Sequence, residues 1–326
     1  MDDVGNKEGM SRRDFLKSAG VFGGKVMADK VLGPLERPKS PEQLRPIEIK
    51  AIALKIGRSD PHEAMRALKQ LFSMERCDVV VTPEFTFHYS LEKDEQGYRK
   101  VTVLYVNRAG AGYNISEYSD PLVISVIENA RLLAAKNGSH IFLSSFYEMD
   151  ERDPHNKEKY KNTMLHIDDH GNIIGVKRKF EAPEGNFSVD INGKAVKVLP
   201  LICGEAWEER IQDPISGKRR SLAPEWVRRG APYHVLIHSL AQGDLKFEEL
   251  QDHVDGDFVA SDKKLPESWY VDTFKDYYSP YFPYLIKGAS VVASDIGTAG
   301  IFESNMRPIK TWKDGDFYVS AIVKVG

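Results

Sequence analysis

The amino-acid sequence predicts a layered α/β domain, and three observations support this prediction. Short apolar runs typical of strands alternate with helical stretches and hairpin signals along most of the chain. Hydrophobic residues make up 41% of the 326 residues, which is enough to form a large core. There is neither an internal repeat nor a low-complexity run, which would indicate a repeat protein or a disordered segment. Strands that alternate with helices therefore indicate a layered α/β domain.

The first 46 residues are predicted to form a targeting segment and a linker. Residues 11–17, SRRDFLK, resemble the twin-arginine export motif. The apolar run that follows, residues 18–24, is short for a signal segment, and a tail with a solvated arginine pair is the alternative. Prolines at positions 34, 38, 41 and 46 indicate a linker. We therefore expect a domain over 47–326 and export to the periplasm or the extracellular space, with a cytoplasmic location as the alternative.

The predicted domain starts with a strand, a helix and a second strand. Residues 47–56 alternate and then fill with apolar side chains, which is typical of a strand. Asp60-Pro61 indicates the start of a helix. Residues 79–81 are three valines that predict a buried strand ending at Thr82-Pro83. Glu84 then follows the carboxyl end of a core strand, a common position for catalytic groups in sheet proteins.

The middle of the chain predicts a long excursion, a helix and a hairpin. Residues 85–119 have weak periodicity and some strand character. Asp120-Pro121 is typical of a helix start, and Asn137-Gly138 of a helix end. Residues 164–167 and 173–176 flank a polar turn that contains glycine, which predicts a hairpin.

An apolar strand over 196–202 runs directly into Cys203. A helical stretch is expected after Cys203, with Gly230 closing it behind Arg229. Further strands are predicted over 141–143, 235–237, 290–293, 300–303 and 317–325.

Composition excludes several classes of function. The chain has 45 Lys and Arg against 48 Asp and Glu, so no basic excess indicates nucleic acid. No run approaches about 18 apolar residues, so no integral membrane segment is expected beyond the possible signal. Two cysteines are too few for a disulfide framework or a four-ligand zinc site. The acidic stretch 252–257 lacks calcium-loop spacing, so we expect neither a metal nor a cofactor.

Cys203 is the candidate nucleophile. A thiol on the turn between a buried strand and a helix projects from the sheet, and the amino end of a helix favours its anionic form. Gly204 leaves the approach open, and its backbone N–H is expected to point to where an oxyanion would form. A lone cysteine is more often an inert buried residue. Cys77, between a helix and a strand, fits that alternative.

Three sequence segments occur in an order that resembles the nitrilase, or carbon–nitrogen hydrolase, superfamily. They are VVVTPEF, YKNTMLHIDDHGNIIGVKRKFEAP and VKVLPLICGEAW. Taken singly, Glu84 could be a surface carboxylate, and Lys177-Arg178-Lys179 could be a solvated face. The resemblance covers about residues 47–326. It implies a four-layer αββα sandwich, no cofactor and a homo-oligomer.

The resemblance implies a role for each matching residue. Glu84 would be the general base, Lys179 the electrostatic stabiliser and Cys203 the nucleophile. A second glutamate often follows the lysine in this family, and Glu184 is the best match, with Glu181 the runner-up. Glu205 stands where many relatives have aspartate, which implies a minor buried carboxylate contact.

The expected activity is thiol-dependent hydrolysis of a non-peptide C–N bond in a small amide or carbamoyl compound, or in a nitrile. An amine acyltransferase with the same site and a non-catalytic binding protein with the same fold are the alternatives. The aromatic residues between Trp269 and Tyr284 are expected to pack in the core, or else to line the substrate mouth. Residues 85–89 are a second candidate wall of that mouth.

Overall fold

The computed structural model describes residues 46–55, 61–84, 87, 89–93, 95, 99–149, 160–206, 210–212, 219–221, 223–240, 275, 278–294, 299–311 and 317–326. The twin-arginine-like segment and nearly all of the predicted linker lie outside these ranges, as does the acidic stretch 252–257. Export of the protein therefore stays a prediction.

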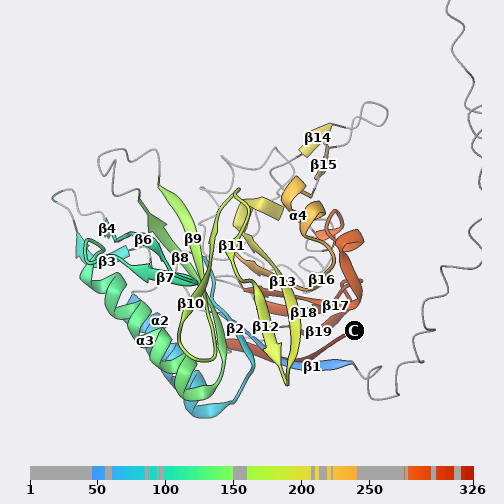
Figure 1. Cartoon of the computed structure of the whole chain (residues 1–326), viewed down its shortest axis with the longest axis horizontal. Helices are drawn as coiled ribbons and strands as arrows, with labels where there is room; N and C mark the ends of the chain where they lie inside the picture. The colour runs from blue at the N-terminus through green and yellow to red at the C-terminus, as the bar shows by residue number, and fades with distance from the viewer. Residues whose placement is uncertain are drawn as a thin grey trace, which may run out of the picture. The chain divides into compact units, whose positions relative to one another are not determined.

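The first sheet has eight strands, of which the central ones run parallel (Figure 1). In spatial order they are β11 (Glu184–Gly185), β10 (Ile173–Arg178), β9 (Lys161–Ile167), β8 (His140–Glu148), β2 (Val79–Val81), β1 (Ile47–Leu54) and β20 (Tyr318–Val325), and β5 (Val103–Leu104) pairs with β8. Strands β1, β2 and β8 are parallel, whereas β9, β10, β11 and β20 add antiparallel pairings on either side.

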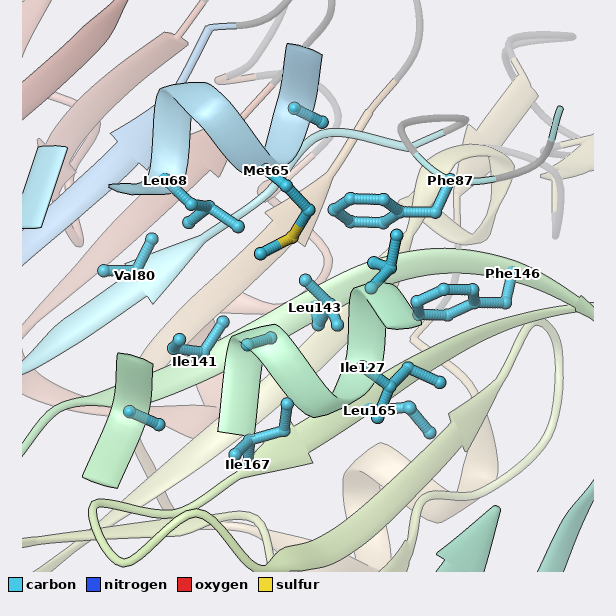
Figure 2. Close-up of a cluster of buried hydrophobic side chains, with 14 of the residues drawn as sticks. Met65, Leu68, Val80, Phe87, Ile127, Ile141, Leu143, Phe146, Leu165 and Ile167 are labelled. Carbon is cyan, nitrogen blue, oxygen red and sulfur yellow. The ribbon is translucent and has the colours of Figure 1, made fainter. Parts of the chain in front are cut away.

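Two amphipathic helices cover one face of this sheet: α2 (Pro61–Met74) and α3 (Pro121–Asn137). The Asp120 side chain caps α3 by accepting the N–H of Leu122 at 2.8 Å, and Gly138 ends the helix with φ of 62°. In Figure 2, Met65 and Leu68 of α2 and Ile127 of α3 lie against side chains of β2, β8 and β9. None of the described helices is long and apolar enough to cross a membrane.

The second sheet has six strands, and its three central strands β13, β16 and β17 run parallel. Its order is β12 (Ser188–Ile191), β13 (Lys194–Ile202), β16 (Tyr233–Ser239), β17 (Leu285–Ser294), β18 (Ala299–Glu303) and β19 (Pro308–Thr311). A core of side chains from both sheets, among them Val79, Val198 and Ile237, fills the space between them. A further core on the other face of this sheet includes side chains of α4 (Glu225–Gly230) and of the segment 278–285.

These layers form an αββα sandwich, so the predicted fold class is confirmed. The two helices predicted from Asp60-Pro61 and Asp120-Pro121 are present, and so are the predicted strands, most of which are longer than expected. The excursion after Glu84 contains two hairpins, formed by β3 (Tyr89–Lys93) with β4 (Arg99–Val101) and by β6 (Val106–Ala109) with β7 (Gly112–Ile115).

The helical stretch predicted directly after Cys203 is wrong for most of the residues that the structure describes there. A single 3-10 turn, η3 (Cys203–Ala206), is followed by the paired strands β14 (Arg210–Gln212) and β15 (Arg219–Ser221). Among the described residues between Ala206 and Ala231, α-helix is confined to Glu225–Gly230. The carboxylate of Glu205 accepts the N–H groups of Ile202 and Phe180 and pairs with the buried Lys177, so contacts with a distant part of the chain hold this turn.

Candidate active site

Glu84 lies where the carboxyl ends of the two sheets' parallel strands meet. It follows β2, and its backbone N–H donates to the carbonyl of Leu240, just after β16, at 3.0 Å. The hydroxyl of Ser239 donates to the carbonyl of Thr82 at 2.8 Å and ties the same two strand ends together. The Glu84 side chain is fully buried. The surface-carboxylate alternative is therefore wrong.

Lys179 follows β10 and faces Glu84. Its ammonium Nζ lies 3.6 Å from Glu84 Oε1, and its side chain is 19% exposed. Asn162 on β9 joins the two residues, because its carbonyl accepts the Lys179 N–H at 2.9 Å while its amide Nδ2 donates to Glu84 Oε1 at 2.6 Å. Asn162 belongs to the predicted hairpin, but no chemical signal in the sequence singled it out.

Cys203 directly follows β13 and begins η3 in a left-handed backbone conformation, with φ of 44°. Its thiol lies close enough to the Glu84 carboxylate, the Lys179 ammonium and the Gly204 N–H for all three to shift its pKa. The structure therefore brings Glu84, Lys179 and Cys203 together.

The expectation that this turn favours the anionic thiol is contradicted. Burial and the neighbouring Glu84 carboxylate raise the pKa of the Cys203 thiol well above its ordinary value, and Lys179 and the Gly204 N–H offset only part of that rise. A 3-10 turn of four residues has little dipole to oppose burial. The resting thiol is protonated near neutral pH and needs a base to ionise. Burial, with smaller contributions from Asp78 and Glu75, raises the pKa of Cys77 to about 12, in keeping with an inert cysteine.

A buried ion pair links the two chain segments that present Lys179 and Cys203. Lys177, which is completely buried, donates to the carboxylate of Glu205 and, at 2.7 Å each, to the carbonyls of Arg178 and Glu181. Burial lowers the pKa of Lys177 and raises that of Glu205. The run Lys177-Arg178-Lys179 is thus no solvated face. Glu205 was expected to make only a minor contact, but it forms a buried ion pair with Lys177.

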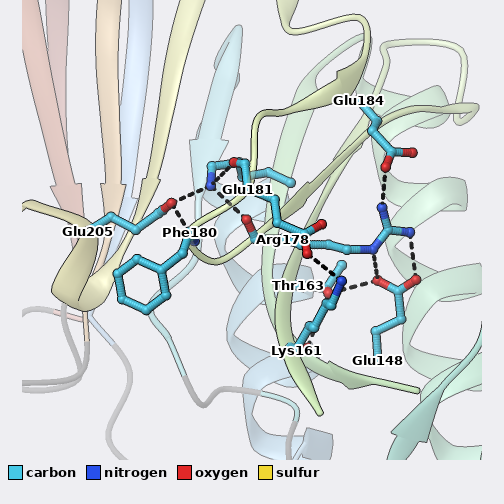
Figure 3. Close-up of polar contacts among 9 residues, drawn as sticks. Glu148, Lys161, Thr163, Arg178, Phe180, Glu181, Glu184 and Glu205 are labelled. Carbon is cyan, nitrogen blue, oxygen red and sulfur yellow. Dashed lines mark hydrogen bonds and ion pairs between the residues drawn. The ribbon is translucent and has the colours of Figure 1, made fainter. Parts of the chain in front are cut away.

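Glu205 also accepts two backbone N–H groups that border the candidate residues. These are the N–H of Phe180, next to Lys179, at 2.8 Å, and that of Ile202, next to Cys203, at 2.7 Å. Figure 3 shows Glu205 beside Phe180, at one end of a network that extends to Glu148. One carboxylate therefore fixes the backbone on both sides of the site.

The described contacts do not join Glu184 to Glu84, Lys179 or Cys203. Glu184 is half exposed and pairs with Arg178 at 2.6 Å, because the short strand β11 sets it beside β10 (Figure 3). Arg178 also donates two bonds, of 2.7 and 2.8 Å, to Glu148. The carboxylate of Glu181, the runner-up, pairs with Lys161 at the surface.

Buried residues behind the Cys203 turn were not predicted from the sequence. His238 on β16 donates from Nε2 to the carbonyl of Cys203 at 2.8 Å, and its Nδ1 lies 2.7 Å from the Tyr278 hydroxyl. The hydroxyl of Tyr281 donates to the carbonyl of Glu205. Both tyrosines are fully buried, so for them the core-packing expectation is confirmed. Phe87, from the other candidate wall, is also buried in a core.

Across the described ranges, no group of three or more His, Cys, Asp or Glu side chains is arranged to hold a metal ion. The groups that the site offers for chemistry are a carboxylate, an ammonium, a thiol and a backbone N–H.

The layers and this site define an α/β protein with the nitrilase-like fold, and comparison with solved structures supports that class. Nit3 of Saccharomyces cerevisiae, a member of branch 10 of the nitrilase superfamily, is similar with a TM-score of 0.50 and 13% identity over 85% of this chain and 90% of that one. A carbon–nitrogen hydrolase from Helicobacter pylori G27 is similar with a TM-score of 0.50 and 15% identity over 84% and 89%. The NitFhit protein of C. elegans is similar with a TM-score of 0.50 and 14% identity over 86% of this chain and 62% of that one.

At sequence identities of 13–15%, the similarity to these solved structures shows that the fold is shared. A comparison with protein-family models finds no match, and a comparison with curated protein sequences finds none either. The oligomeric state implied by the resemblance stays a prediction.

Proposed function

We propose that this chain is a carbon–nitrogen hydrolase of the nitrilase superfamily that cleaves the C–N bond of a small amide or carbamoyl compound. One observation carries the proposal: Glu84, Lys179 and Cys203 converge on one site from three distant parts of the sequence. The fold shared with nitrilase-superfamily structures supports it.

The first half-reaction follows from the positions of these groups. Glu84 accepts the thiol proton as the Cys203 sulfur attacks the substrate carbonyl carbon. The raised pKa of Cys203 makes this base necessary, because little thiolate is present beforehand. The negative charge that develops on the carbonyl oxygen is stabilised by the Lys179 ammonium and the Gly204 N–H.

The second half-reaction regenerates the enzyme. When the tetrahedral intermediate collapses, the C–N bond breaks, the protonated Glu84 gives its proton to the departing amine or ammonia, and a thioester on Cys203 remains. Glu84 then accepts a proton from water, which attacks the thioester. Release of the acid returns the proton to sulfur. Asn162 holds the carboxylate of Glu84 in place for both transfers.

The test is an activity screen over short amides, ureido acids and nitriles with matched cysteine variants. We expect Cys203→Ala to abolish turnover, whereas Cys77→Ala, which alters the buried and inert thiol, keeps it. Glu84→Gln should block both half-reactions, so neither a burst of amine nor steady turnover is expected. Turnover by Cys203→Ala at the parent rate would contradict the proposal.

A further inference from the structure

The peptide bond between Cys203 and Gly204 is held from both sides. Its carbonyl oxygen accepts the His238 Nε2–H at 2.8 Å, and its N–H lies close enough to the Cys203 sulfur to lower the pKa of the thiol. This bond is not among the cis peptide bonds of the described residues. In a planar trans peptide the C=O and the N–H point in opposite directions. The bond from His238 to the carbonyl therefore fixes the direction in which the Gly204 N–H points.

The hydrogen-bond partners determine the form of the His238 ring. A carbonyl can only accept, so Nε2 must carry the hydrogen. Burial lowers the pKa of His238 to about 3, so the ring is neutral and its Nδ1 is an acceptor. The Tyr278 hydroxyl, 2.7 Å away, therefore donates to Nδ1. Tyr278 thus selects the one neutral tautomer that can donate to Cys203.

The turn needs such an anchor because its backbone is strained. Cys203 has φ of 44°, and a residue with a side chain pays about 1 kcal/mol or more in this left-handed region. If the peptide rotated, the carbonyl oxygen would replace the N–H beside the sulfur. The site would then lose a donor to the thiolate and to the oxyanion, and it would gain a partial negative charge in the same place.

We propose that His238, with its tautomer set by Tyr278, is a positioning residue that aims the Gly204 N–H at the Cys203 sulfur and at the developing oxyanion. The role of His238 toward the oxyanion rests on the proposed function. The part that concerns the sulfur can be measured without any substrate.

The experiment follows alkylation of Cys203 by iodoacetamide as a function of pH, in the Cys77→Ala background so that one thiol is labelled. The test variants are His238→Leu and Tyr278→Phe. His238→Leu removes the N–H that donates to the Cys203 carbonyl, and Tyr278→Phe removes the hydroxyl that fixes the tautomer of His238. His238→Gln retains an amide N–H donor at a similar reach. Tyr233→Phe is the matched control, because it removes a buried tyrosine hydroxyl from the same core without a described contact to the turn.

The Gly204 N–H lowers the pKa of Cys203, so its loss should raise that pKa and slow alkylation at a given pH. We expect alkylation near neutral pH to slow about tenfold in His238→Leu and in Tyr278→Phe, which corresponds to one pKa unit. His238→Gln should stay closer to the parent, and Tyr233→Phe should match it. With a substrate from the screen, kcat should fall about tenfold or more with little change in KM.

The pH profile decides between positioning and a merely structural role. Parent-like profiles in both His238→Leu and Tyr278→Phe would overturn the proposal, even if both variants melt at lower temperature. If His238→Leu does not fold, the comparison of Tyr278→Phe with Tyr233→Phe decides alone. Should the parent turn over no screened compound, the proposed function fails, yet the alkylation profiles still test the role of His238.

Discussion

At the scale of single residues, the two charged neighbours of Cys203 act on its thiol in opposite directions. The Glu84 carboxylate raises the pKa of the thiol, and the Lys179 ammonium lowers it. Burial contributes most to the raised pKa, and together with these two charges it leaves a protonated thiol beside a base that can accept its proton. This balance suits a nucleophile that forms only when the substrate is in place.

Replacing either charge should therefore shift the Cys203 pKa in a known direction. Glu84→Gln removes the carboxylate charge, so the pKa should fall and the thiolate fraction at neutral pH should rise about tenfold or more. Lys179→Met should raise the pKa and lower that fraction. The ultraviolet absorbance of the thiolate, followed in a pH titration in the Cys77→Ala background, measures both. Turnover should be lost in both variants, and in Glu84→Gln it should be lost although more thiolate is present, because the base is missing. Shifts of the Cys203 pKa in the same direction in both variants would contradict this account.

The positions of the three candidate residues were predictable because each stands in a local motif. The protonation state of Cys203 was not, because a rule about helix ends takes no account of burial or of a carboxylate 119 positions away in the chain. Asn162 and His238 escaped prediction for a related reason. Their roles depend on which strands become neighbours, and an asparagine or histidine within a strand gives no sign of that.

At the scale of elements, the hairpin β9–β10 is fixed to the Cys203 turn by the Lys177–Glu205 ion pair. Both side chains are buried, with 0% and 1% of their surfaces exposed. The same carboxylate accepts N–H groups from Phe180 and Ile202. Buried pairs of this kind add little net stability, but the loss of one partner leaves a charge without compensation.

Lys177→Met should consequently lower the free energy of unfolding by about 3–5 kcal/mol. The double variant Lys177→Met/Glu205→Gln should recover part of that loss, because no buried charge remains. Urea unfolding followed by circular dichroism measures both. Lys161→Met is the control, since it breaks a lysine–glutamate pair that is about 40% exposed and should cost at most about 1 kcal/mol. Equal losses in Lys177→Met and Lys161→Met would show that burial of the pair does not matter.

Elements with their own start and stop signals were predicted well. The cap at Asp120 and the left-handed Gly138 bound α3 at both ends, as the local sequence indicates. The stretch after Cys203 was predicted to be helical, whereas the structure has a 3-10 turn and two paired strands before α4. The carboxylate of Glu205 holds that turn through Lys177 and Phe180, which lie 28 and 25 positions away, so these contacts are not visible in the local sequence.

At the scale of the whole molecule, buried neutral histidines should make the fold sensitive to acid. Burial lowers the pKa of His166 and that of His238 to about 3 in the folded protein, against 6.5 for an ordinary histidine. Below about pH 6.5 the unfolded chain binds protons that the folded chain does not. Stability is therefore complete above that pH and falls as the pH drops toward 3, by up to about 1.4 kcal/mol per pH unit for each histidine.

Urea midpoints measured at pH 7, 6, 5 and 4 test this expectation. Below about pH 6, His166→Gln should reduce the number of protons taken up on unfolding by about one, and the unfolding free energy should then depend less steeply on pH. His170→Gln is the control, because it removes a largely exposed histidine instead of a buried one. An unaltered slope in His166→Gln would mean that this ring is protonated in the folded state.

Much of the architecture was predictable, since alternation of strands and helices indicates layers whatever their order. The order of strands in each sheet was not. β12, β11 and β19 are short or polar and leave weak patterns, and the pairing of β1 with β20 joins residues some 270 positions apart. Only the resemblance to a known superfamily supplied the four layers.

That last pairing has a consequence for how the protein is made. All eight residues of β1 align with residues of β20, and Ile49, Ala53 and Val323 are buried between the sheets. A ribosome completes β1 long before it reaches β20, so the growing chain carries an open sheet edge until β20 has been made. A product that stops short of Tyr318 would contain every residue of the candidate site and still leave that edge available to other chains.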